Sequence, residues 1–398
     1  MRILFLSQRV PYPPNRGDKI TTWRLIERMS RAHEVVSVAF AHDAKDLAAA
    51  RELDAKGFPC HAFPYDQRKA KLRSLPLLAT RTPLTLGVYG SRALQAKVDE
   101  LIRGCDMAYA YSSSMGAFLE KHSSKPRVMH FGELDSDKWR QYAERARFPM
   151  SWVYAREQRT LLEFEARIAQ SFTQNVFCTP LEEKIFHEQI PRAPSLVLRN
   201  GVDLDFFRPA SSPPEPAHIA FTGVMNYFPN VDGCVWFARE ILPIVRRSVP
   251  AARFTIVGAH PTREVSALAG IPGVTVTGFV DDTRTHLHKA QLSVAPLRIA
   301  RGIQNKVLEA LALGLPVVGT TCATQGVDGV PERDYRVRDD AEGFARAVVE
   351  LLQDPGAAAE LGRRGRRFVE QQYDWEVVFE PLDRLLADCA RRPVGAGR

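Results

Sequence analysis

Short runs of almost wholly apolar residues alternate with longer amphipathic stretches through the first half of the chain. Strands whose two faces are both covered are apolar at successive positions, so these runs predict buried strands of a parallel sheet. The expected strands cover residues 3–6, 35–40, 59–63, 107–111, 127–131 and 175–179. Amphipathic stretches predict helices between them, at 18–31, 43–56 and, as the longest, 151–172. This order predicts a doubly wound α/β domain.

The second half of the chain repeats this plan. Strands are expected at 218–222, 253–257, 274–277, 292–295 and 316–319, a helix at 230–249, and three closing helices at 340–352, 357–371 and 375–391. Residues 208–216, between the halves, hold four prolines and two serines, a composition typical of a stiff linker. We therefore expect a first Rossmann-like domain at 1–195, a second at 196–372, and a terminal helix at 373–398.

Three of the strands expected in the second half end directly in glycine, at Gly223, Gly258 and Gly278. In open α/β sheets, ligands bind beyond the carboxyl ends of the strands. Glycine lets the backbone approach a ligand closely, because it has no side chain. The sequence therefore predicts a ligand site along this edge of the second sheet.

The segment 301–318 carries the chemistry expected at that edge. A helix is predicted to begin near Gly302 and to end at Gly314, and Lys306 and Glu309 are three residues apart on one of its faces. The free N–H groups at a helix start and a nearby lysine suit a phosphate group, and a carboxylate one turn later can accept hydrogen bonds from a ribose. An isolated Lys/Glu pair is usually a solvated helix face, but the position beside the strand ends favours a nucleotide-diphosphate site.

Composition limits the other possibilities. The 398 residues carry a formal net charge of +8, yet no zinc, RNP or helix-turn-helix signature indicates nucleic acid. The sequence contains no run of about 18 apolar residues, so no membrane-spanning helix is expected. The N-terminus is expected to be a strand and not a signal peptide. The six cysteines have no CxxC spacing and are expected to be free, mostly buried thiols in a reducing cytoplasm.

One region is both basic and rich in leucine. Such a segment can lie on anionic lipid headgroups, or it can be a solvated loop over a small core, and the sequence favours neither. Its basic residues are Arg68, Lys69, Lys71, Arg73, Arg81 and Arg92, and its leucines are Leu72, Leu75, Leu77, Leu78 and Leu84.

Several segments together resemble the GT-B glycosyltransferases, and in particular family 4, the retaining group that uses nucleotide sugars. They are the N-terminal strand with its loop at 5–18, the interdomain segment 199–209, the strand ends at 221–223, 256–258 and 276–280, and the stretch 306–318. The chain is most similar to the sugar transferases associated with PEP-CTERM/exosortase systems. The resemblance implies two domains facing across a cleft, with the terminal helix returning toward the first domain.

The resemblance also implies roles for residues of the second domain. Glu309 matches the second glutamate of the EX7E motif, which binds the donor ribose, whereas the first glutamate is replaced by Arg301. Lys306 and Arg298 are then expected to supply charge to the diphosphate, and Arg301 to hold either the diphosphate or a substrate acid. The segment expected to face the transferred sugar and its phosphates is Gly302, Ile303, Gln304 and Asn305. Gly223 ends the first strand of this domain and is expected near the donor. Gly278, Phe279 and Val280 follow the third strand and are expected to contact the base.

The first domain departs further from the family pattern. The usual double glycine of the acceptor loop is reduced to Gly17 and Asp18. His130, at a strand end, is the candidate for the family's N-domain histidine, although a structural histidine fits equally well. Glu133, Asp135 and Asp137 follow it, and they could bind acceptor hydroxyls or cap the next helix at Ser136 or Asp137.

The resemblance thus implies a transferase that moves a sugar from a nucleotide diphosphate to an acceptor hydroxyl with retention, in exopolysaccharide or cell-surface glycan synthesis. No cofactor or metal is expected besides the nucleotide-sugar donor, since fixed cations and helix N–H groups can stabilise the leaving diphosphate. Expected partners are a glycan or lipid-linked acceptor and the inner face of the cytoplasmic membrane. The alternatives are a sugar-nucleotide 2-epimerase of the same fold and a non-catalytic nucleotide-sugar-binding protein.

Overall fold

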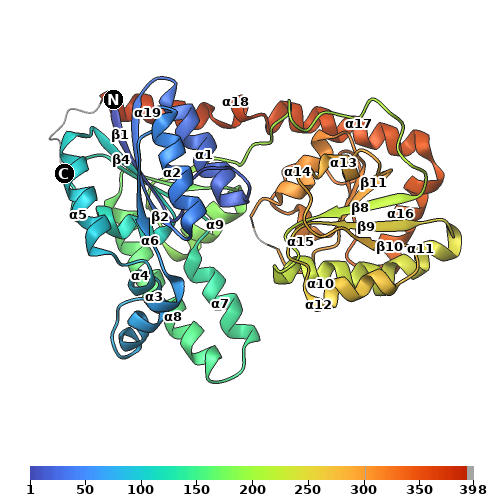
Figure 1. Cartoon of the computed structure of the whole chain (residues 1–398), viewed down its shortest axis with the longest axis horizontal. Coiled ribbons are helices and arrows are strands. Elements are labelled where there is room, and N and C mark those ends of the chain that lie inside the picture. The colour runs from blue at the N-terminus through green and yellow to red at the C-terminus, as the bar shows by residue number, and fades with distance from the viewer. Residues whose placement is uncertain (301, 392–398) are drawn as a thin grey trace. The chain divides into compact units, whose positions relative to one another are not determined.

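The computed structural model describes residues 1–300 and 302–391, and the chain divides into two compact units. The first unit is Met1–Leu198 together with the chain from Phe379 onward, and the second is Arg199–Val378 (Figure 1). The divisions lie within a few residues of the domain limits expected at 195 and 372. The cleft between the domains stays a prediction.

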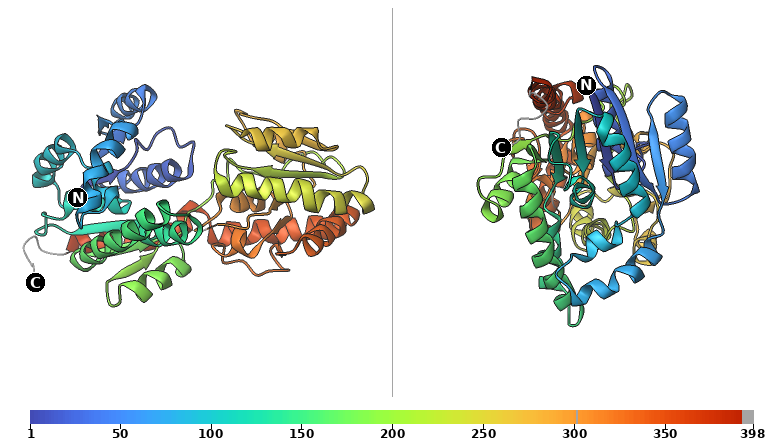
Figure 2. Two further views of the ribbon diagram at one scale, coloured as in Figure 1. Left: turned by 90° about the horizontal axis from the view of Figure 1, so that it is seen from below. Right: turned by 90° about the vertical axis from the view of Figure 1, so that its left-hand side faces the viewer.

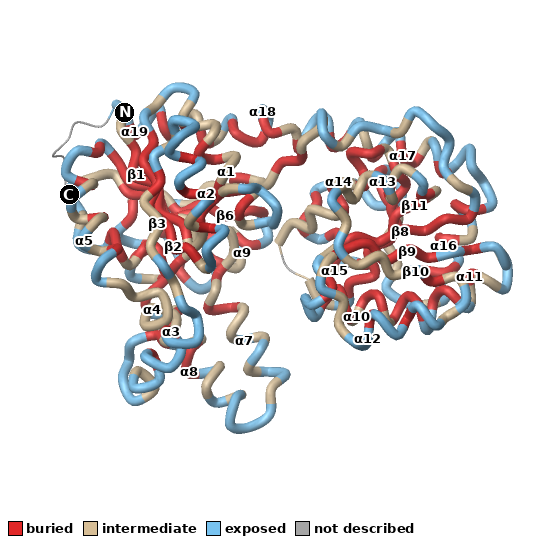
Figure 3. The backbone as a smooth tube through the Cα atoms, viewed as in Figure 1, coloured by how far each residue is buried: buried red, intermediate tan, exposed pale blue. Residues whose placement is uncertain are grey.

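The first unit is built on a seven-stranded parallel sheet of order β3-β2-β1-β4-β5-β6-β7. Its strands are β1 (Arg2–Ser7), β2 (Glu34–Ala41), β3 (Cys60–Pro64), β4 (Met107–Tyr111), β5 (Arg127–Gly132), β6 (Gln174–Phe177) and β7 (Ser195–Val197). The six expected strands are confirmed. They form because their apolar side chains are covered on both faces, and the interior of the sheet is buried (Figure 3).

Helices cover both faces of the first sheet (Figure 2). They are α1 (Gly17–Ser30), α2 (Ala44–Ala55), α3 (Gln67–Ser74), α4 (Leu84–Val88), α5 (Arg92–Leu101), α6 (Ser113–Gly116), α7 (Asp135–Arg145), α8 (Met150–Ser171), α9 (Pro180–Gln189) and α19 (Glu380–Arg391). The final helix α19 belongs to this unit, where Asp383 forms a 2.6 Å ion pair with Arg28 on α1.

The second unit holds a six-stranded parallel sheet of order β10-β9-β8-β11-β12-β13. Its strands are β8 (His218–Thr222), β9 (Arg253–Val257), β10 (Val274–Val276), β11 (Leu292–Ala295), β12 (Val317–Gly319) and β13 (Arg336–Val337). Its helices are α10 (Phe228–Trp236), α11 (Leu242–Ser248), α12 (Arg263–Ala267), α13 (Arg284–Leu287), α14 (Asn305–Ala312), α15 (Thr321–Thr324), α16 (Ala341–Gln353), α17 (Pro355–Gln372) and α18 (Trp375–Val378).

Two expected helices are interrupted, in both cases beside a proline. The helix expected at 230–249 contains a π-helical turn, Phe237–Ile241, just before Pro243. The helix expected at 375–391 breaks between α18 and α19, beside Pro381. A proline has no N–H to donate, and its ring clashes with the carbonyl four residues earlier, so a regular helix cannot continue through it.

The proline-rich stretch 208–216 is not the boundary between the units. It lies inside the second unit, where the Glu215 amide donates to the Lys289 carbonyl over 2.8 Å and the ring of His288 contacts the Arg208 carbonyl at 3.1 Å. The stretch therefore belongs to the second unit and is not the stiff linker between the halves that its composition predicted, because these backbone groups are tied down beside α13.

Candidate functional site

The centre of the second sheet is its topological switch point. Strands β8 and β11 are neighbours there, and the chain leaves β8 toward β9 on one side and β11 toward β12 on the other. The loop after β8 and the segment before α14 therefore meet at the carboxyl edge of the sheet, where doubly wound folds bind their ligands. Gly223 follows β8, and a Cβ placed on it would lie only 3.3 Å from the Lys306 Nζ atom.

Lys306 is held at this edge by residues that the sequence did not single out. Its ammonium donates to the Oδ1 atom of Asn230 on α10 over 2.5 Å and lies 4.7 Å from the ring centroid of Phe221 on β8. Burial lowers the pKa of Lys306 to about 8, which outweighs weaker raising effects of Cys234 and Glu309. The ammonium is therefore partly desolvated and has donor capacity left for an anion.

Glu309 follows one turn later on α14. Burial raises the pKa of its carboxyl to about 7, and the nearby charge of Lys306 opposes that rise. A carboxylate in such a place gains by accepting hydrogen bonds from hydroxyl groups, because they replace the water that it has lost. Lys306 and Glu309 thus lie one turn apart on one helix, as the sequence predicts, and their roles toward a ligand stay predictions.

The start of α14 differs from the prediction. The helix begins at Asn305, because Gly302 has a left-handed φ of 60° and so cannot be helical. Gln304 at the N-cap provides no side-chain cap, and the Asn305 Oδ1 atom is buried without a hydrogen-bond partner in the described structure. Ile303 packs against the hydrophobic core. Arg301 lies outside the described residues.

Two further predicted donor contacts have different surroundings. Arg298 forms a 2.5 Å ion pair with Asp232 on α10, so its charge is already matched by a carboxylate. Gly278 follows β10 with a φ of 71°, and the next residue, Phe279, is 74% exposed. Val280 continues this loop, which begins two strands away from β8 at the same edge of the sheet.

Sequence reasoning missed the contribution of α10. Asn230 and Asp232 lie seven and nine positions after Gly223, and they fix Lys306 and Arg298 respectively. The available signal was a pair of polar residues two positions apart, the third and fifth residues of a helix that follows a glycine loop. Without knowledge of the packing, such a pair is typical of any partly solvated helix.

In the first unit, the polar side chains predicted to belong to a site have hydrogen-bond or ion-pair partners within the protein. His130 is 1% exposed, and its Nδ1 atom is 2.7 Å from the hydroxyl of Tyr109, which is also buried. Burial lowers the pKa of His130 to about 3, so the ring is neutral. These contacts are those of a structural histidine, and its catalytic role stays a prediction.

The loop at Gly17 and Asp18 also has internal partners. Gly17 begins α1, and Asp18 forms ion pairs with Arg16 at 2.6 Å and with Arg9 at 3.6 Å. Further along α1, Lys19 is buried in a 2.7 Å ion pair with Asp46. The polar residues of this loop therefore hold the turn after β1 in place.

The acidic residues after β5 lie in or beside α7. Asp135 accepts hydrogen bonds from Ser113 at 2.6 Å and Lys138 at 2.5 Å, and Asp137 pairs with Arg140 at 2.7 Å. Helix α7 begins at Asp135 and has Leu134 at its N-cap, so the expected cap at Ser136 or Asp137 was wrong.

Two absences concern only the residues placed by the structure, 1–300 and 302–391. No group of three or more His, Cys, Asp or Glu side chains is arranged to hold a metal ion. Within the same residues, no helix has both the length and the apolar character needed to cross a bilayer. The six cysteines are free thiols, five of them buried.

Comparison with known proteins bears on both units. Residues 216–354 match the family described as "Glycosyl transferases group 1". Over its whole length the fold matches sucrose-phosphate synthase from Thermosynechococcus elongatus, with a TM-score of 0.69, 18% identity and 98% of each chain covered. It matches equally the Anabaena protein HepE in complex with UDP, with a TM-score of 0.69, 16% identity, and 98% and 100% of the two chains covered. The fold is therefore GT-B.

The curated relatives are more distant in sequence. A Mycobacterium tuberculosis glycogen synthase is 28% identical over 46% of this chain and 45% of its own length. A GDP-mannose-dependent phosphatidylinositol monomannoside mannosyltransferase of the same organism is 30% identical over 51% and 58%. The chain thus spans about half the length of these relatives. An uncharacterised Klebsiella pneumoniae protein from the cps region is 21% identical over 96% of this chain and 98% of its own.

Proposed function

We propose that this chain transfers a sugar from a nucleotide-diphosphate donor to an acceptor hydroxyl with retention of the anomeric configuration, as in family 4. The bond between the anomeric carbon and the phosphate oxygen breaks, and a bond from the same carbon to the acceptor oxygen forms. The acceptor proton passes to the leaving diphosphate. The observation that carries this proposal is the placement of Gly223, Lys306 and Glu309 at the switch point of the second sheet.

The side chains around this point suit the two ends of a nucleoside diphosphate. Lys306 and the uncapped start of α14 favour negative charge, and that charge grows on the diphosphate as the sugar leaves. Glu309 accepts hydroxyl hydrogen bonds from the ribose. Gly278, Phe279 and Val280 are proposed to contact the base. HepE was solved with UDP, which supports a nucleotide donor here.

We propose that metal is not required. Lys306, Arg301 and helix N–H groups stabilise the negative charge of the leaving group. Arg298 can contribute only when its ion pair with Asp232 is broken. Addition of a metal chelator should therefore leave turnover unchanged.

The proposed setting is the synthesis of exopolysaccharide or another surface glycan, at the cytoplasmic face of the membrane. The Klebsiella relative from the cps region matches this chain over nearly the whole length of both proteins. The resemblance to the PEP-CTERM/exosortase-associated transferases also implies glycan synthesis. The acceptor is then a glycan or a lipid-linked glycan.

The basic, leucine-rich segment supports contact with anionic lipid. Leu72 lies among the basic residues of α3 and is 68% exposed, and Leu75, directly after this helix, is 52% exposed. The segment is held on α8, where buried Arg156 donates to the carbonyls of Leu77 and Thr80. Exposed apolar groups beside cations are typical of surfaces that lie on anionic headgroups.

A screen of nucleotide sugars tests the donor. A bound donor should raise the unfolding temperature by mass action, and slow hydrolysis should release the nucleoside diphosphate. With acceptor extract, NMR of the product should show the donor's anomeric configuration. Epimerisation of a donor incubated alone would establish the epimerase instead, and binding without hydrolysis or transfer would establish a binding protein.

Vesicle flotation tests the membrane surface. The protein should float with vesicles that contain phosphatidylglycerol and not with pure phosphatidylcholine vesicles. The variant Leu72→Asp/Leu75→Asp should lose this difference, and the exposed Leu181→Asp on α9 is a matched control. Equal flotation of wild type and the double variant would contradict the assignment of this segment.

A further inference from the structure

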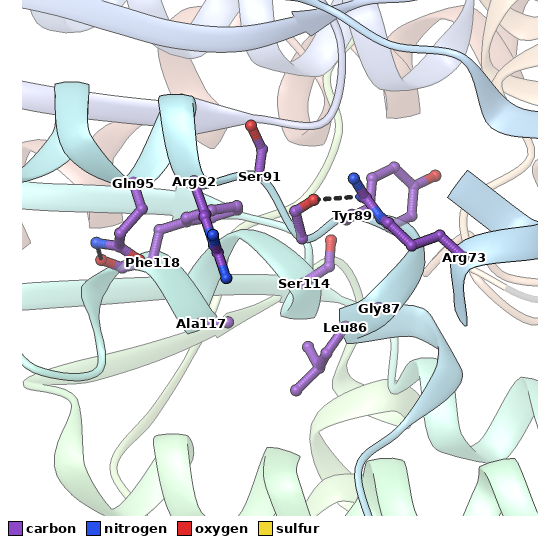
Figure 4. A pocket seen from close by; sticks show the side chains of 11 residues that line it. Arg73, Leu86, Gly87, Tyr89, Ser91, Arg92, Gln95, Ser114, Ala117 and Phe118 are labelled. Carbon is purple, nitrogen blue, oxygen red and sulfur yellow. Dashed lines mark hydrogen bonds between the residues drawn. The ribbon is translucent and has the colours of Figure 1, made fainter. Parts of the chain in front are cut away.

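The first unit contains a pocket of about 720 Å³ that the proposed donor site does not use (Figure 4). Its walls come from α3, α4, α5 and α6. Leu86, Ala117 and Phe118 give it an apolar surface, and Tyr89 adds an aromatic ring. This volume is in the range of small-molecule sites.

The pocket reaches the switch point of the first sheet. Strands β1 and β4 are neighbours there, and the chain leaves them in opposite directions. Ser114, which follows β4 and lines the pocket, accepts a 2.8 Å hydrogen bond from Gln8, which follows β1. The pocket therefore lies where a doubly wound domain binds its ligand.

Two guanidinium groups give this pocket its charge. Arg73 on α3 and Arg92 on α5 both line it, and Figure 4 shows their side chains beside the cavity. Arg73 donates to the Gly90 carbonyl over 2.7 Å, which leaves most of its N–H groups available. Arg92 has no hydrogen-bond or ion-pair partner among the described residues, and none of those that line the pocket is acidic.

The backbone adds to this positive potential. Ser91 is the N-cap of α5 and Arg92 is its first residue, so the positive end of the helix dipole lies at the pocket wall. Both arginines are exposed, and they share a concave site whose other walls include apolar side chains. Guanidinium groups bind phosphate and carboxylate groups through paired N–H donors.

We propose that this pocket binds the acceptor through an anionic group, a phosphate or a carboxylate, held by Arg73 and Arg92. The role as acceptor rests on the proposed transferase function, but the binding of an anion does not. The apolar wall would then contact the carbon skeleton next to the charge. Two sources carry such a group: the phosphate of a lipid-linked acceptor and the carboxylate of a sugar acid.

Ligand-observed NMR titration of the full chain tests the pocket and separates these sources. Geranyl phosphate is compared with geraniol, and methyl glucuronide with methyl glucoside. We expect at least one anionic probe to bind about tenfold more tightly than its uncharged counterpart. Arg73→Gln/Arg92→Gln should remove this preference, and Arg92→Lys should restore part of it relative to Arg92→Gln.

Two controls distinguish this pocket from other cationic sites. Arg81→Gln removes an exposed charge from the same segment without touching the pocket, and it should keep the preference. Lys306→Met removes the cation of the donor site, and it should keep the preference as well. The arginines are exposed, so circular dichroism should show all variants folded.

The outcomes are separate for the two proposals. Equal binding of charged and uncharged probes by wild type, or loss of the preference in Lys306→Met alone, would overturn the anion pocket. Preference for geranyl phosphate supports a lipid-linked phosphate, and preference for methyl glucuronide supports a sugar acid. If the pocket binds its anion while no donor is ever hydrolysed or transferred, the pocket stands and the transferase proposal fails.

Discussion

The carboxyl edges of the two sheets have the same topology but differ in how far their polar groups satisfy one another. At the first edge, His130 is paired with Tyr109, and Asp135 receives Ser113 and Lys138. At the second, the side chain of Lys306 has one hydrogen-bond acceptor in the described structure, and the Asn305 Oδ1 atom has no partner.

At the first edge the polar groups maintain the fold, whereas at the second some keep unused hydrogen-bonding capacity, as the proposed donor site requires. A buried histidine with a matched partner is neutral and inert, whereas a desolvated lysine beside a desolvated glutamate gains free energy when a ligand supplies the missing contacts. The first domain has such open groups at a different place, in the pocket beside Arg73 and Arg92.

Lys306→Met should have the largest effect. Loss of the only lysine charge at the α14 start should lower donor hydrolysis and transfer by about a hundredfold or more, since preorganised donors of this kind contribute that much. The unfolding temperature should change little, because the removal of a desolvated charge is opposed by the loss of the donor to the buried Asn230 Oδ1 atom. Lys289→Met, at an exposed position of the same unit, is the control. Normal turnover by Lys306→Met would remove the contrast between the two edges.

Glu309→Gln should weaken the donor less. The amide keeps the shape of the side chain but loses charge-assisted hydrogen bonds, so KM for the donor should rise about ten- to a hundredfold. Initial rates over a range of donor concentrations measure this change. Glu264→Gln on the exposed surface of α12 should leave KM unchanged. An unchanged KM in Glu309→Gln would argue that Glu309 does not contact the ribose.

The pH dependence of donor capture should be narrow. Glu309 has a pKa of about 7, so it is mostly ionised above pH 7. Lys306 has a pKa of about 8, so it is mostly charged below pH 8. The kcat/KM for the donor should therefore be greatest between these values and fall by about tenfold per pH unit on each side. Lys306→Met should lose the alkaline limb and move the acidic limb to higher pH, because the Lys306 charge no longer opposes the rise of the Glu309 pKa. A flat profile from pH 6 to 9 would contradict both assignments.

His130→Phe should have the smallest effect on the donor. The hydroxyl of Tyr109 would lose its buried partner, so the free energy of unfolding should fall by about 1–3 kcal/mol. Urea denaturation measures this fall, and donor hydrolysis should stay within about twofold of wild type. The opposite result, lost transfer with unchanged stability, would establish His130 as the family's catalytic histidine.

Much of the fold could be predicted because its signals are local. Apolar runs mark the central strands, and the glycines after β8, β9 and β10 mark the carboxyl edge of the second sheet, where the donor site is proposed. The start of α14 was placed three residues early, because the sequence does not show that Gly302 is left-handed. The breaks beside Pro243 and Pro381 follow from a local rule, because proline cannot donate to a helix.

The partners of the site residues could not be predicted, because they depend on packing between distant segments. Lys306 meets Asn230 across 76 positions, and Arg298 meets Asp232 across 66. Each partner lies on α10, where a single Asn and a single Asp among apolar residues form no distinguishing pattern. The burial of His130 depends in the same way on Tyr109, from the neighbouring strand.

The division of the chain has a consequence for its synthesis. The second unit is one continuous segment, while the first is completed only by the residues after Val378. On the ribosome, the whole of the second unit is therefore made before α19 exists to cover α1 and to pair Asp383 with Arg28. The N-terminal domain, although translated first, is the last to be finished.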